Sequence, residues 1–374
     1  MIEQLQIHQL RNLQAVNLTL KRCNLFVGDN ASGKTSLLEA VFLLSRGKSF
    51  RHHEPKRYIS HYQNSCTVWA TTPYHTLALQ KQLDAKNFAT SLLKLDGQIV
   101  PTQSALSLAL PVLLIDPSGM AMLEEGSGGR RQLLDWLAFH VEPRFYGVWL
   151  AYQRLLRQRN ALLKATNMHF GELMAWDKQL AYHAKHLHDY RHTVFASWVQ
   201  SFEMMIAKLL PAYVGQINLS YQAGFDEKLG LFASLQQRLA SDKELGHTRI
   251  GAHRADVLVL LNKTNQSGNK LKEQAANILS RGEKKLLITA LRLSQLQTVC
   301  QNQSHAIPVV LIDDIDAELD DKAVDVFLQT ALSLPCQLLI TSLNPDMDAL
   351  IQQKIADKMD YQRFLVKAGN IVPS

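Results

Sequence analysis

The sequence contains few cysteines, and their spacing excludes two classes of protein. Among the 374 residues are four cysteines, with no Cys-x-x-Cys pair: Cys23, Cys66, Cys300 and Cys336. A disulfide framework or a structural zinc site would need cysteines at closer, regular spacings. We therefore expect buried free thiols in a protein of a reducing compartment.

Long apolar runs and long heptad repeats are also missing. No stretch of about 18 apolar residues occurs, so the sequence predicts no membrane-spanning helix. The first residues show no basic segment followed by an apolar one, so we expect no secretory signal and a cytoplasmic protein. No heptad pattern persists beyond about three or four repeats, which excludes a long coiled coil.

The charge balance is modestly positive. Lys and Arg number 40 against 33 Asp and Glu, giving a net charge of +7. Such a field suits a polyanion such as nucleic acid, although a solubilising surface would explain it equally well. A chain of this length, 47% hydrophobic and 20% charged, predicts a folded protein of roughly two domains.

The segment Gly28–Ser36 fits G-x-x-x-x-G-K-[ST], the P-loop pattern. The apolar run Leu25–Val27 enters it like a strand, and Leu37–Leu44 leaves it like a helix. Backbone N–H groups and the positive end of the helix dipole would face an anion there. The alternative is a chance glycine turn before a helix. The predicted nucleotide-binding residues are Gly28, Asp29, Asn30, Ala31, Ser32, Gly33, Lys34, Thr35 and Ser36.

Two of these side chains have predicted roles in binding ATP and Mg²⁺. Lys34 would reach the β- and γ-phosphates, and the Thr35 hydroxyl would ligate the metal. A second motif near the other end of the chain would complete the site. The apolar run Ile307–Ile312 reads as a buried strand ending in Asp313 and Asp314, the Walker B pattern.

Asp313 would hold the Mg²⁺ shell, and Asp314 would orient or deprotonate the attacking water. A core strand with an acidic turn is the alternative. Ala317–Asp320 resembles the D-loop of ABC-type ATPases.

Upstream, Leu279–Glu283 resembles the ABC signature Leu-Ser-Gly-Gly-Gln, before a predicted helix at 284–299. The Ser280 hydroxyl and the Gly282 N–H would contact a γ-phosphate at the start of this helix. Alone, the pentapeptide would be an ordinary helix cap. In ABC proteins this signature acts on ATP held by the other subunit, so the resemblance implies a dimer with two ATP molecules between its heads.

The remaining pattern places an inserted arm between two halves of a head. We predict an N-terminal head segment (1–120), a mainly helical arm (121–245) and a C-terminal head segment (246–374). Helical spacing runs from Arg130 to about Leu210 and ends at Pro211. Strands are predicted around 7–20, with a turn at Arg11–Asn12, and around 66–70, 76–83, 92–100, 112–115, 217–221 and 257–261. Asp96–Gly97 is predicted to be a hairpin turn.

Two basic segments and a histidine-rich stretch have open interpretations. The loop 46–53 is either a solvated face or a contact for DNA or nucleotide, and the arginines at 154–159 form a second basic segment. His188 and His192 have the i, i+4 spacing that a metal site could use, although an exposed arm helix is the favoured interpretation.

Together these motifs make the sequence resemble the RecF family of DNA replication and repair ATPases, which are related to SMC heads. The matching residues cover nearly the whole chain: Gly28–Thr35, Leu38–Ala40, Leu44–Arg51, Arg130–Arg131, Leu134–Asp135, Tyr152, Arg159–Leu163, Gly251, His253–Arg254, Ser280–Gly282, Asp313–Asp314 and Glu318–Asp320. The resemblance implies an α/β fold: an ABC-type ATPase head with an inserted helical arm.

The resemblance also implies a function and partners. It implies ATP-dependent binding of duplex or gapped DNA and single-strand/double-strand junctions in recombinational repair, by an ATP-bound homodimer that hydrolyses ATP slowly. It further implies a RecR-type mediator as partner and help in loading the recombinase. An ABC transporter subunit, an SMC-like scaffold and a P-loop kinase are the alternatives. The absence of a switch histidine at Thr341–Ser342 opposes the transporter.

Four positions depart from the family pattern: Ala31, Ser36, Ala255 and Glu283. Glu283 replaces a usual glutamine of the signature. A carboxylate there would repel phosphate unless Lys284 or Lys285 paired with it.

Overall fold

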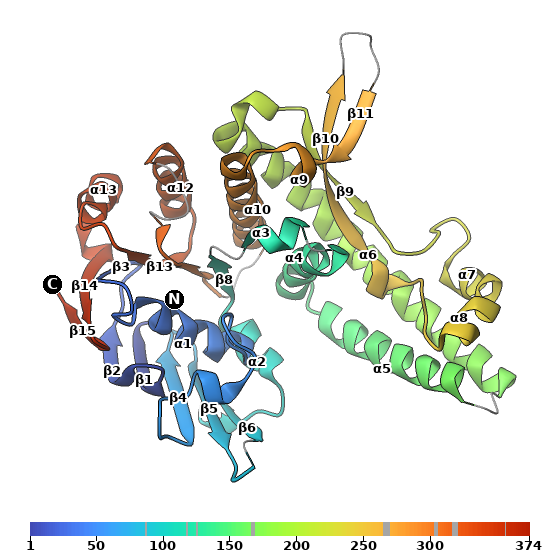
Figure 1. Ribbon diagram of the computed structural model, residues 1–374, viewed down its shortest axis with the longest axis horizontal. Helices are drawn as coiled ribbons and strands as arrows, with labels where there is room; N and C mark the ends of the chain where they lie inside the picture. The colour runs from blue at the N-terminus through green and yellow to red at the C-terminus, as the bar shows by residue number, and fades with distance from the viewer. Residues whose placement is uncertain are drawn as a thin grey trace. The chain divides into compact units, whose positions relative to one another are not determined.

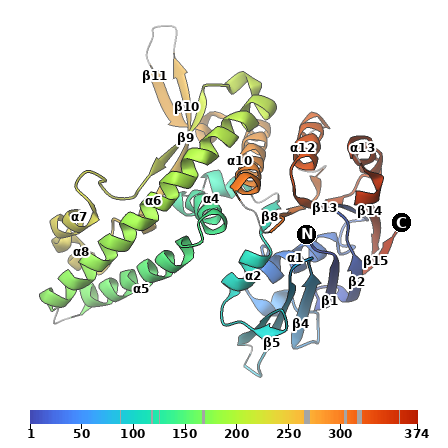
Figure 2. The same ribbon diagram turned by 180° about the vertical axis from the view of Figure 1, so that it is seen from behind.

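The structure is a computed structural model that describes residues 1–86, 88–116, 119–124, 126–165, 169–264, 270–302, 306–315, 321–355 and 357–374. The chain forms two compact units, which Figures 1 and 2 show from opposite sides. Unit 1 comprises Met1–Gly119 and Cys300–Ser374, and unit 2 comprises Met120–Val299. The division into two head segments and an arm stays a prediction.

One sheet of unit 1 is antiparallel, with the described strands in the order β2-β1-β4-β5-β6-β7. Buried and exposed residues alternate along β1 and β4, as expected where one face of a sheet covers a core. Asp96 and Gly97 both have positive φ between β6 and β7, which confirms the hairpin turn predicted there. The strands are β1 (Gln4–Leu10), β2 (Leu13–Thr19), β4 (Ser65–Thr71), β5 (Thr76–Leu83), β6 (Ala89–Leu95) and β7 (Gln98–Ile99).

The other sheet of unit 1 has the order β15-β14-β3-β13-β12-β8, with only β15 antiparallel to its neighbour among the described strands. Four of its strands are buried along their whole length because the sheet is covered on both faces. The strands are β3 (Cys23–Val27), β8 (Val112–Ile115), β12 (Val309–Ile312), β13 (Gln337–Ser342), β14 (Tyr361–Lys367) and β15 (Asn370–Pro373).

Strand order in this sheet brings the two predicted nucleotide motifs together. Parallel strands end at the same edge of a sheet, and β13 lies between β3 and β12. The P-loop after β3 and the carboxylates after β12 therefore share that edge, where α/β proteins bind ligands.

Helix α1 (Lys34–Arg46) packs between the two sheets of unit 1, as Figure 1 shows. Leu37, Leu38, Val41 and Leu44 are buried in the core that joins the sheets. The helix ends at Gly47, whose positive φ of 70° closes the last turn. Helix α2 (Gln103–Ala109) packs against α1, whereas α12 (Asp321–Ser333) and α13 (Met347–Lys354) pack against each other on the other face of the parallel sheet.

Unit 2 is mainly helical. Helices α5 and α6 run side by side, and α6 ends at Leu209, where the proline at 211 was expected to stop it. A small antiparallel sheet has the described strands in the order β11-β10-β9. The elements are α3 (Gly119–Glu124), α4 (Gly126–Val141), α5 (Phe145–Lys164), α6 (Phe170–Leu209), β9 (Ile217–Gln222), α7 (Leu231–Gln237), α8 (Leu239–Leu245), β10 (Asp256–Thr264), β11 (Lys270–Gln274), α9 (Ala275–Ile278) and α10 (Arg281–Asn302).

The described helices include none that is long and apolar enough to cross a membrane.

Candidate functional site: a P-loop pocket

The P-loop connects the buried strand β3 to α1, as predicted. Two of its glycines are required by the chain's own packing. A Cβ on Gly28 would lie 2.2 Å from the Val366 backbone oxygen, and Gly33 has a φ of 122° that L side chains rarely adopt. Ala31, which departs from the family pattern, has a φ of 61° in the left-handed region. The loop is therefore held close against β14 in a conformation that needs its glycines.

The Lys34 side chain lies inside this loop. It is 4% exposed, and its Nζ donates to the backbone oxygens of Gly28 at 2.7 Å and Asp29 at 3.2 Å. Its ammonium is also 3.8 Å from Asp314 Oδ1. A single buried cation thus joins the start of the loop to the carboxylate after β12, which is the position that phosphate binding requires of this lysine.

Thr35 and Asp313 meet directly at the edge of the parallel sheet. The Thr35 hydroxyl donates to Asp313 Oδ1 at 3.0 Å. Burial raises the pKa of the Asp313 carboxyl, while hydrogen bonds from Thr35 and Thr341 oppose that rise. A hydroxyl and a buried carboxylate in contact are oxygen ligands of the kind that Mg²⁺ prefers, so the predicted metal ligands fit the ion.

Thr341, at the end of β13, is a site residue that the sequence analysis did not identify. Its hydroxyl lies 3.1 Å from Asp313 Oδ1 and accepts the backbone N–H of Asp314 at 2.8 Å. It therefore contacts the carboxylate of Asp313 and fixes the backbone of Asp314. Because β13 lies between β3 and β12, its strand end was a signal that could have found it. The same residue stands where a transporter ATPase would carry its switch histidine.

Ser36 and the turn between β1 and β2 close the back of the loop. Ser36 Oγ donates to Asn12 Oδ1 at 3.0 Å, and Asn12 Nδ2 donates to the Ala31 oxygen at 3.3 Å. Ser32 Oγ is buried and has no hydrogen-bond partner among the described residues. This orphaned hydroxyl leaves a polar group of the loop available to a ligand.

The P-loop lines a pocket of about 870 Å³ whose other wall is basic. Besides the loop and Asp314, the lining includes Arg11, Asn12, Arg51, His52, Lys56, Arg57, Ile59 and His61. The predicted basic loop 46–53 thus supplies two residues to the pocket, which favours its interpretation as a nucleotide contact. We call Arg51, His52, Lys56 and Arg57 the basic wall.

The signature pentapeptide lies in unit 2, at the start of α10. Ser280 and Gly282 are exposed, and a Cβ on Gly282 would meet nothing within 4 Å. Glu283 folds back on the helix start, where its Oε2 accepts the Ser280 N–H at 2.8 Å and the Ser280 hydroxyl at 2.7 Å. Tyr213 donates to the other oxygen, Oε1, at 2.7 Å. This is a capping box, the helix cap considered as the alternative.

Lys284, one of the two lysines expected to pair with Glu283, pairs with another carboxylate. Lys284 forms its ion pair with Glu124, at 2.8 Å, while Ser280 and Tyr213 occupy the Glu283 carboxylate. The predicted D-loop, 317–320, lies outside the described residues.

One part of the predicted arm surface is wrong. Arg159 is fully buried, and its guanidinium donates to Asp177 at 2.6 Å and to Asp242 and Thr248 at 2.8 and 2.7 Å. A buried arginine between two carboxylates cannot contact a phosphate backbone. Of the arginines at 154–159, only Arg154 and Arg157 are exposed on α5 and remain available to DNA.

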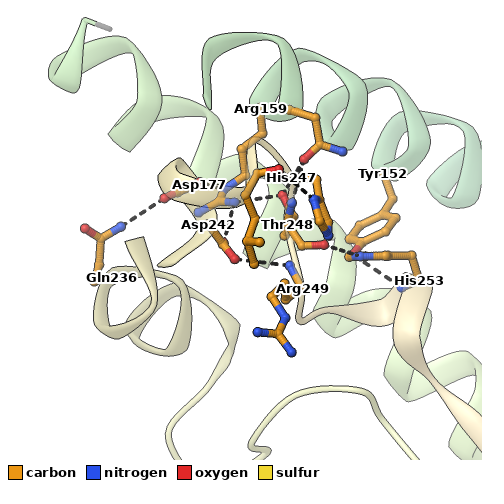
Figure 3. Close-up of polar contacts among 11 residues, drawn as sticks. Tyr152, Arg159, Asp177, Gln236, Asp242, His247, Thr248, Arg249 and His253 are labelled. Carbon is orange, nitrogen blue, oxygen red and sulfur yellow. Dashed lines mark hydrogen bonds and ion pairs between the residues drawn. The ribbon is translucent and has the colours of Figure 1, made fainter. Parts of the chain in front are cut away.

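Figure 3 shows that several residues carrying the family resemblance gather around this arginine. The Asn160 oxygen accepts the Thr248 N–H at 2.8 Å, and the Tyr152 hydroxyl lies 2.8 Å from His253 Nδ1. Burial lowers the pKa of His253 to about 4, so this imidazole is neutral at pH 7. A Cβ on Gly251 would lie 2.5 Å from the Tyr152 hydroxyl. We call this set the Arg159 cluster, and it is a buried scaffold. Its members are Tyr152, Arg159, Asn160, Asp177, Asp242, Thr248, Gly251 and His253.

The histidine-rich stretch lies on α6 and packs against aromatic rings. His188 stacks on Tyr221, with ring centroids 5.6 Å apart. Among the described residues, no group of three or more His, Cys, Asp or Glu side chains is placed to hold a metal ion.

The fold of unit 1 and its P-loop edge define an ATPase head of the ABC/SMC type, which confirms the predicted fold class. Solved structures share the fold over the whole chain. The recombination mediator protein RecF with ATP, from the RecFOR pathway, gives a TM-score of 0.80 at 21% identity and covers 100% of this chain and 99% of its own. The Smc head domain of Pyrococcus furiosus bound to the C-terminal domain of ScpA gives 0.56 at 14% identity, covering 100% and 96%.

Sequence comparison then specifies the family. The model of the RecF/RecN/SMC N terminal domain matches residues 1–363. The DNA replication and repair protein RecF of Acinetobacter baylyi is 39% identical over 372 residues, which is 99% of both chains. The chain belongs to the RecF family within this larger group, as its motifs predicted.

Proposed function

We propose that this protein is an ATP-dependent DNA-binding protein of recombinational repair and replication restart. The observation that carries the proposal is the pocket lined by Lys34, Thr35 and Asp314, with Asp313 in contact with the Thr35 hydroxyl. Its relatives are named DNA replication and repair proteins, and a structural neighbour is a recombination mediator with bound ATP. DNA is intracellular, so we place the protein in the cytoplasm.

In the proposed site the residues of unit 1 have separate roles. The loop Gly28–Ser36 surrounds the phosphates. When ATP binds, the Lys34 ammonium leaves the backbone oxygens of Gly28 and Asp29 and donates to phosphate oxygens instead. Thr35 and Asp313 would hold Mg²⁺, which when bound neutralises charge on the phosphate oxygens. Asp314 is the water-orienting base, because it lies beside Lys34 and is partly exposed in the pocket.

The signature supports a dimeric active unit. Gly282 has open space around it within its own chain, and Ser280 is exposed at the first turn of a helix, where anions bind. Nothing in the described part of the chain requires glycine at position 282. We infer that the requirement comes from a second copy, whose P-loop-bound ATP would contact Ser280 and Gly282. Hydrolysis would then be slow and would release the dimer.

DNA would be bound by the basic surfaces that dimerisation brings together. A net charge of +7 per chain is modest, so two chains facing one duplex would offer twice the positive surface. Duplex DNA, gapped DNA and single-strand/double-strand junctions are the proposed substrates, with a RecR-type mediator as partner and loading of the recombinase as the outcome. We expect little sequence preference because phosphate contacts carry no base readout.

The test is to measure the size of the protein and its affinity for duplex DNA with ATP, with ADP and in Ser280→Arg. Arginine at this position places bulk and charge at the signature and leaves the P-loop untouched. Wild-type protein should dimerise with ATP and bind DNA more tightly, and Ser280→Arg should do neither. With about six to ten phosphate contacts, the dimer should lose roughly 10³–10⁵ in affinity between 50 and 200 mM salt.

Nucleotide affinity measured in parallel separates the parts of the proposal. Ser280→Arg should bind ATP normally through its own P-loop. Equal DNA affinity and equal salt slope in all three states would contradict the ATP-dependent dimer.

A further inference from the structure

The carboxylate of Glu39 is buried at the back of the P-loop pocket. It belongs to α1, the helix that follows the P-loop, and its side chain is 0% exposed. Arg11 grips it with two bonds, from Nε to Oε2 at 2.7 Å and from Nη2 to Oε1 at 2.8 Å. This geometry is the strong bidentate form of a charge-assisted pair.

A second group reaches the same carboxylate from the basic loop. The Ser49 hydroxyl donates to Glu39 Oε1 and accepts the backbone N–H groups of Arg51 and His52, each at 3.0 Å. Both of these residues belong to the basic wall. Glu39 therefore fixes, through one hydroxyl, the backbone of the turn that presents them to the pocket.

Arg11 carries the connection to the rest of the wall. Its Nη1 donates to the Arg57 backbone oxygen at 2.7 Å, and its backbone N–H donates to the Tyr58 oxygen at 2.8 Å. Arg11 itself also lines the pocket. The segment containing Lys56 and Arg57 is thus attached to the same carboxylate from the other side.

From these contacts we propose that Glu39 is a positioning residue for the nucleotide, and that it acts by holding Arg11 and the basic wall against the P-loop. Both branches of its hydrogen-bond network end at residues that line the pocket. Burying the Glu39 carboxylate costs free energy because the charge loses its water. The bonds from Arg11 and Ser49 offset that cost only when both groups are held in the observed geometry. The network therefore selects one arrangement of the wall. The inference rests on the proposed nucleotide site and assigns to it a residue that lies outside the P-loop and the Walker B pair.

Glu39→Gln tests the proposal because it keeps the shape and removes the charge that Arg11 needs. ATP affinity is measured by calorimetry, and hydrolysis is measured in a single turnover at saturating ATP. We expect the dissociation constant for ATP to rise roughly tenfold, the order expected for losing a hydrogen bond to a charged group. The single-turnover rate should change less, because Lys34, Thr35 and Asp314 make no contact through Glu39.

Two further variants separate positioning from stability. Glu142→Gln makes the same change in an ion pair with Arg144 of unit 2, outside the lining of the pocket, and should leave ATP affinity within about twofold of wild type. Ser49→Ala removes one branch and should also weaken ATP binding. Combined with Glu39→Gln, it should add little, because both act on one turn.

The results that overturn the inference are distinct from those that overturn the proposed function. An unchanged dissociation constant in folded Glu39→Gln, with only its melting temperature lowered, would make Glu39 a structural residue. If Glu39→Gln does not fold, Ser49→Ala decides alone, and unchanged affinity there rejects the proposal. Unchanged affinity in Lys34→Ala would instead reject the nucleotide site itself.

Discussion

At the P-loop the side chains of Lys34, Thr35 and Ser36 are bound by the chain around them, whereas at the signature pentapeptide Ser280 and Gly282 are exposed. A Cβ added to Gly28 would lie 2.2 Å from the Val366 backbone oxygen, whereas a Cβ added to Gly282 would meet nothing within 4 Å. Lys34 is buried among backbone oxygens, while Ser280 is exposed and held by the carboxylate of Glu283. One half of the proposed site is thus explained by its own fold, and the other half has features that the fold does not require.

Two carboxylate–serine pairs show the same contrast. Glu39 and Ser49 are both buried, and Arg11 holds the Glu39 carboxylate with two bonds, so this pair cannot exchange partners cheaply. Glu283 and Ser280 form an exposed cap, a contact that typically contributes about 1 kcal/mol. A phosphate could displace the second pair and could not displace the first. Burial therefore distinguishes Glu39, which holds other residues in place, from Glu283, whose contact with Ser280 a ligand could replace.

The largest predicted effect is in the P-loop half. Asp314→Asn should slow ATP hydrolysis by roughly 10²–10⁴-fold, the contribution of a general base, while ATP still binds. The variant should accumulate as an ATP-bound dimer. Single-turnover hydrolysis and sizing with ATP measure both. Hydrolysis at the normal rate would assign the water-activating role to another residue.

The next effect concerns the Arg159 cluster and stability alone. Arg159→Met leaves Asp177 and Asp242 buried without their cation and should lower the free energy of unfolding of unit 2 by about 3–5 kcal/mol. Urea denaturation measures it. Arg157→Met, an exposed neighbour on α5, is the control and should change stability by less than about 0.5 kcal/mol. Equal stability of the two variants would show that the cluster is not a scaffold.

Removing the P-loop cation should have a smaller effect, on binding. Lys34→Ala should weaken ATP binding by tenfold or more, since each charge-assisted bond contributes about 1.5–3 kcal/mol. Lys34→Arg should keep more of the affinity but lose turnover, because a planar guanidinium does not replace a point charge. Calorimetry with ATP distinguishes the two variants, and turnover by Lys34→Arg at the wild-type rate would contradict this role.

The features that could be predicted from the sequence are those formed by residues close together along the chain. The P-loop, the Asp313–Asp314 pair and the hairpin at Asp96–Gly97 each have a short pattern with a direct physical meaning. Thr341 and Glu39 act through partners far away in the chain, so no spacing indicated their roles, although Glu39 lies in the Leu38–Ala40 segment of the family resemblance. The fold class followed from the family resemblance that these motifs carry.

Arg159 shows the opposite limit. Its neighbours Arg154 and Arg157 made it look like part of a charged surface, and only the fold reveals the two aspartates around it. Composition counts charges, but it does not say which of them are already neutralised inside the protein.

The smallest predicted effect tests the glycine contrast directly. Gly282 lies in the first turn of α10 with open space around it, so Gly282→Ala should stabilise the protein by roughly 0.4–1 kcal/mol through the unfolded state. If a second copy's ATP approaches this backbone, the added methyl group should nevertheless weaken ATP-dependent dimerisation. Thermal denaturation and sizing with ATP measure the two effects.

Gly171→Ala is the matched control because Gly171 is also the second residue of its helix, α6, and also has nothing within 4 Å of a Cβ. It should give the same stabilisation and leave dimerisation unchanged. Stabilisation without any loss of dimerisation in Gly282→Ala would show that no partner approaches the signature glycine. Loss of dimerisation in Gly282→Ala alone would show that position 282 is glycine for the sake of a second molecule, at a small cost to the stability of the first.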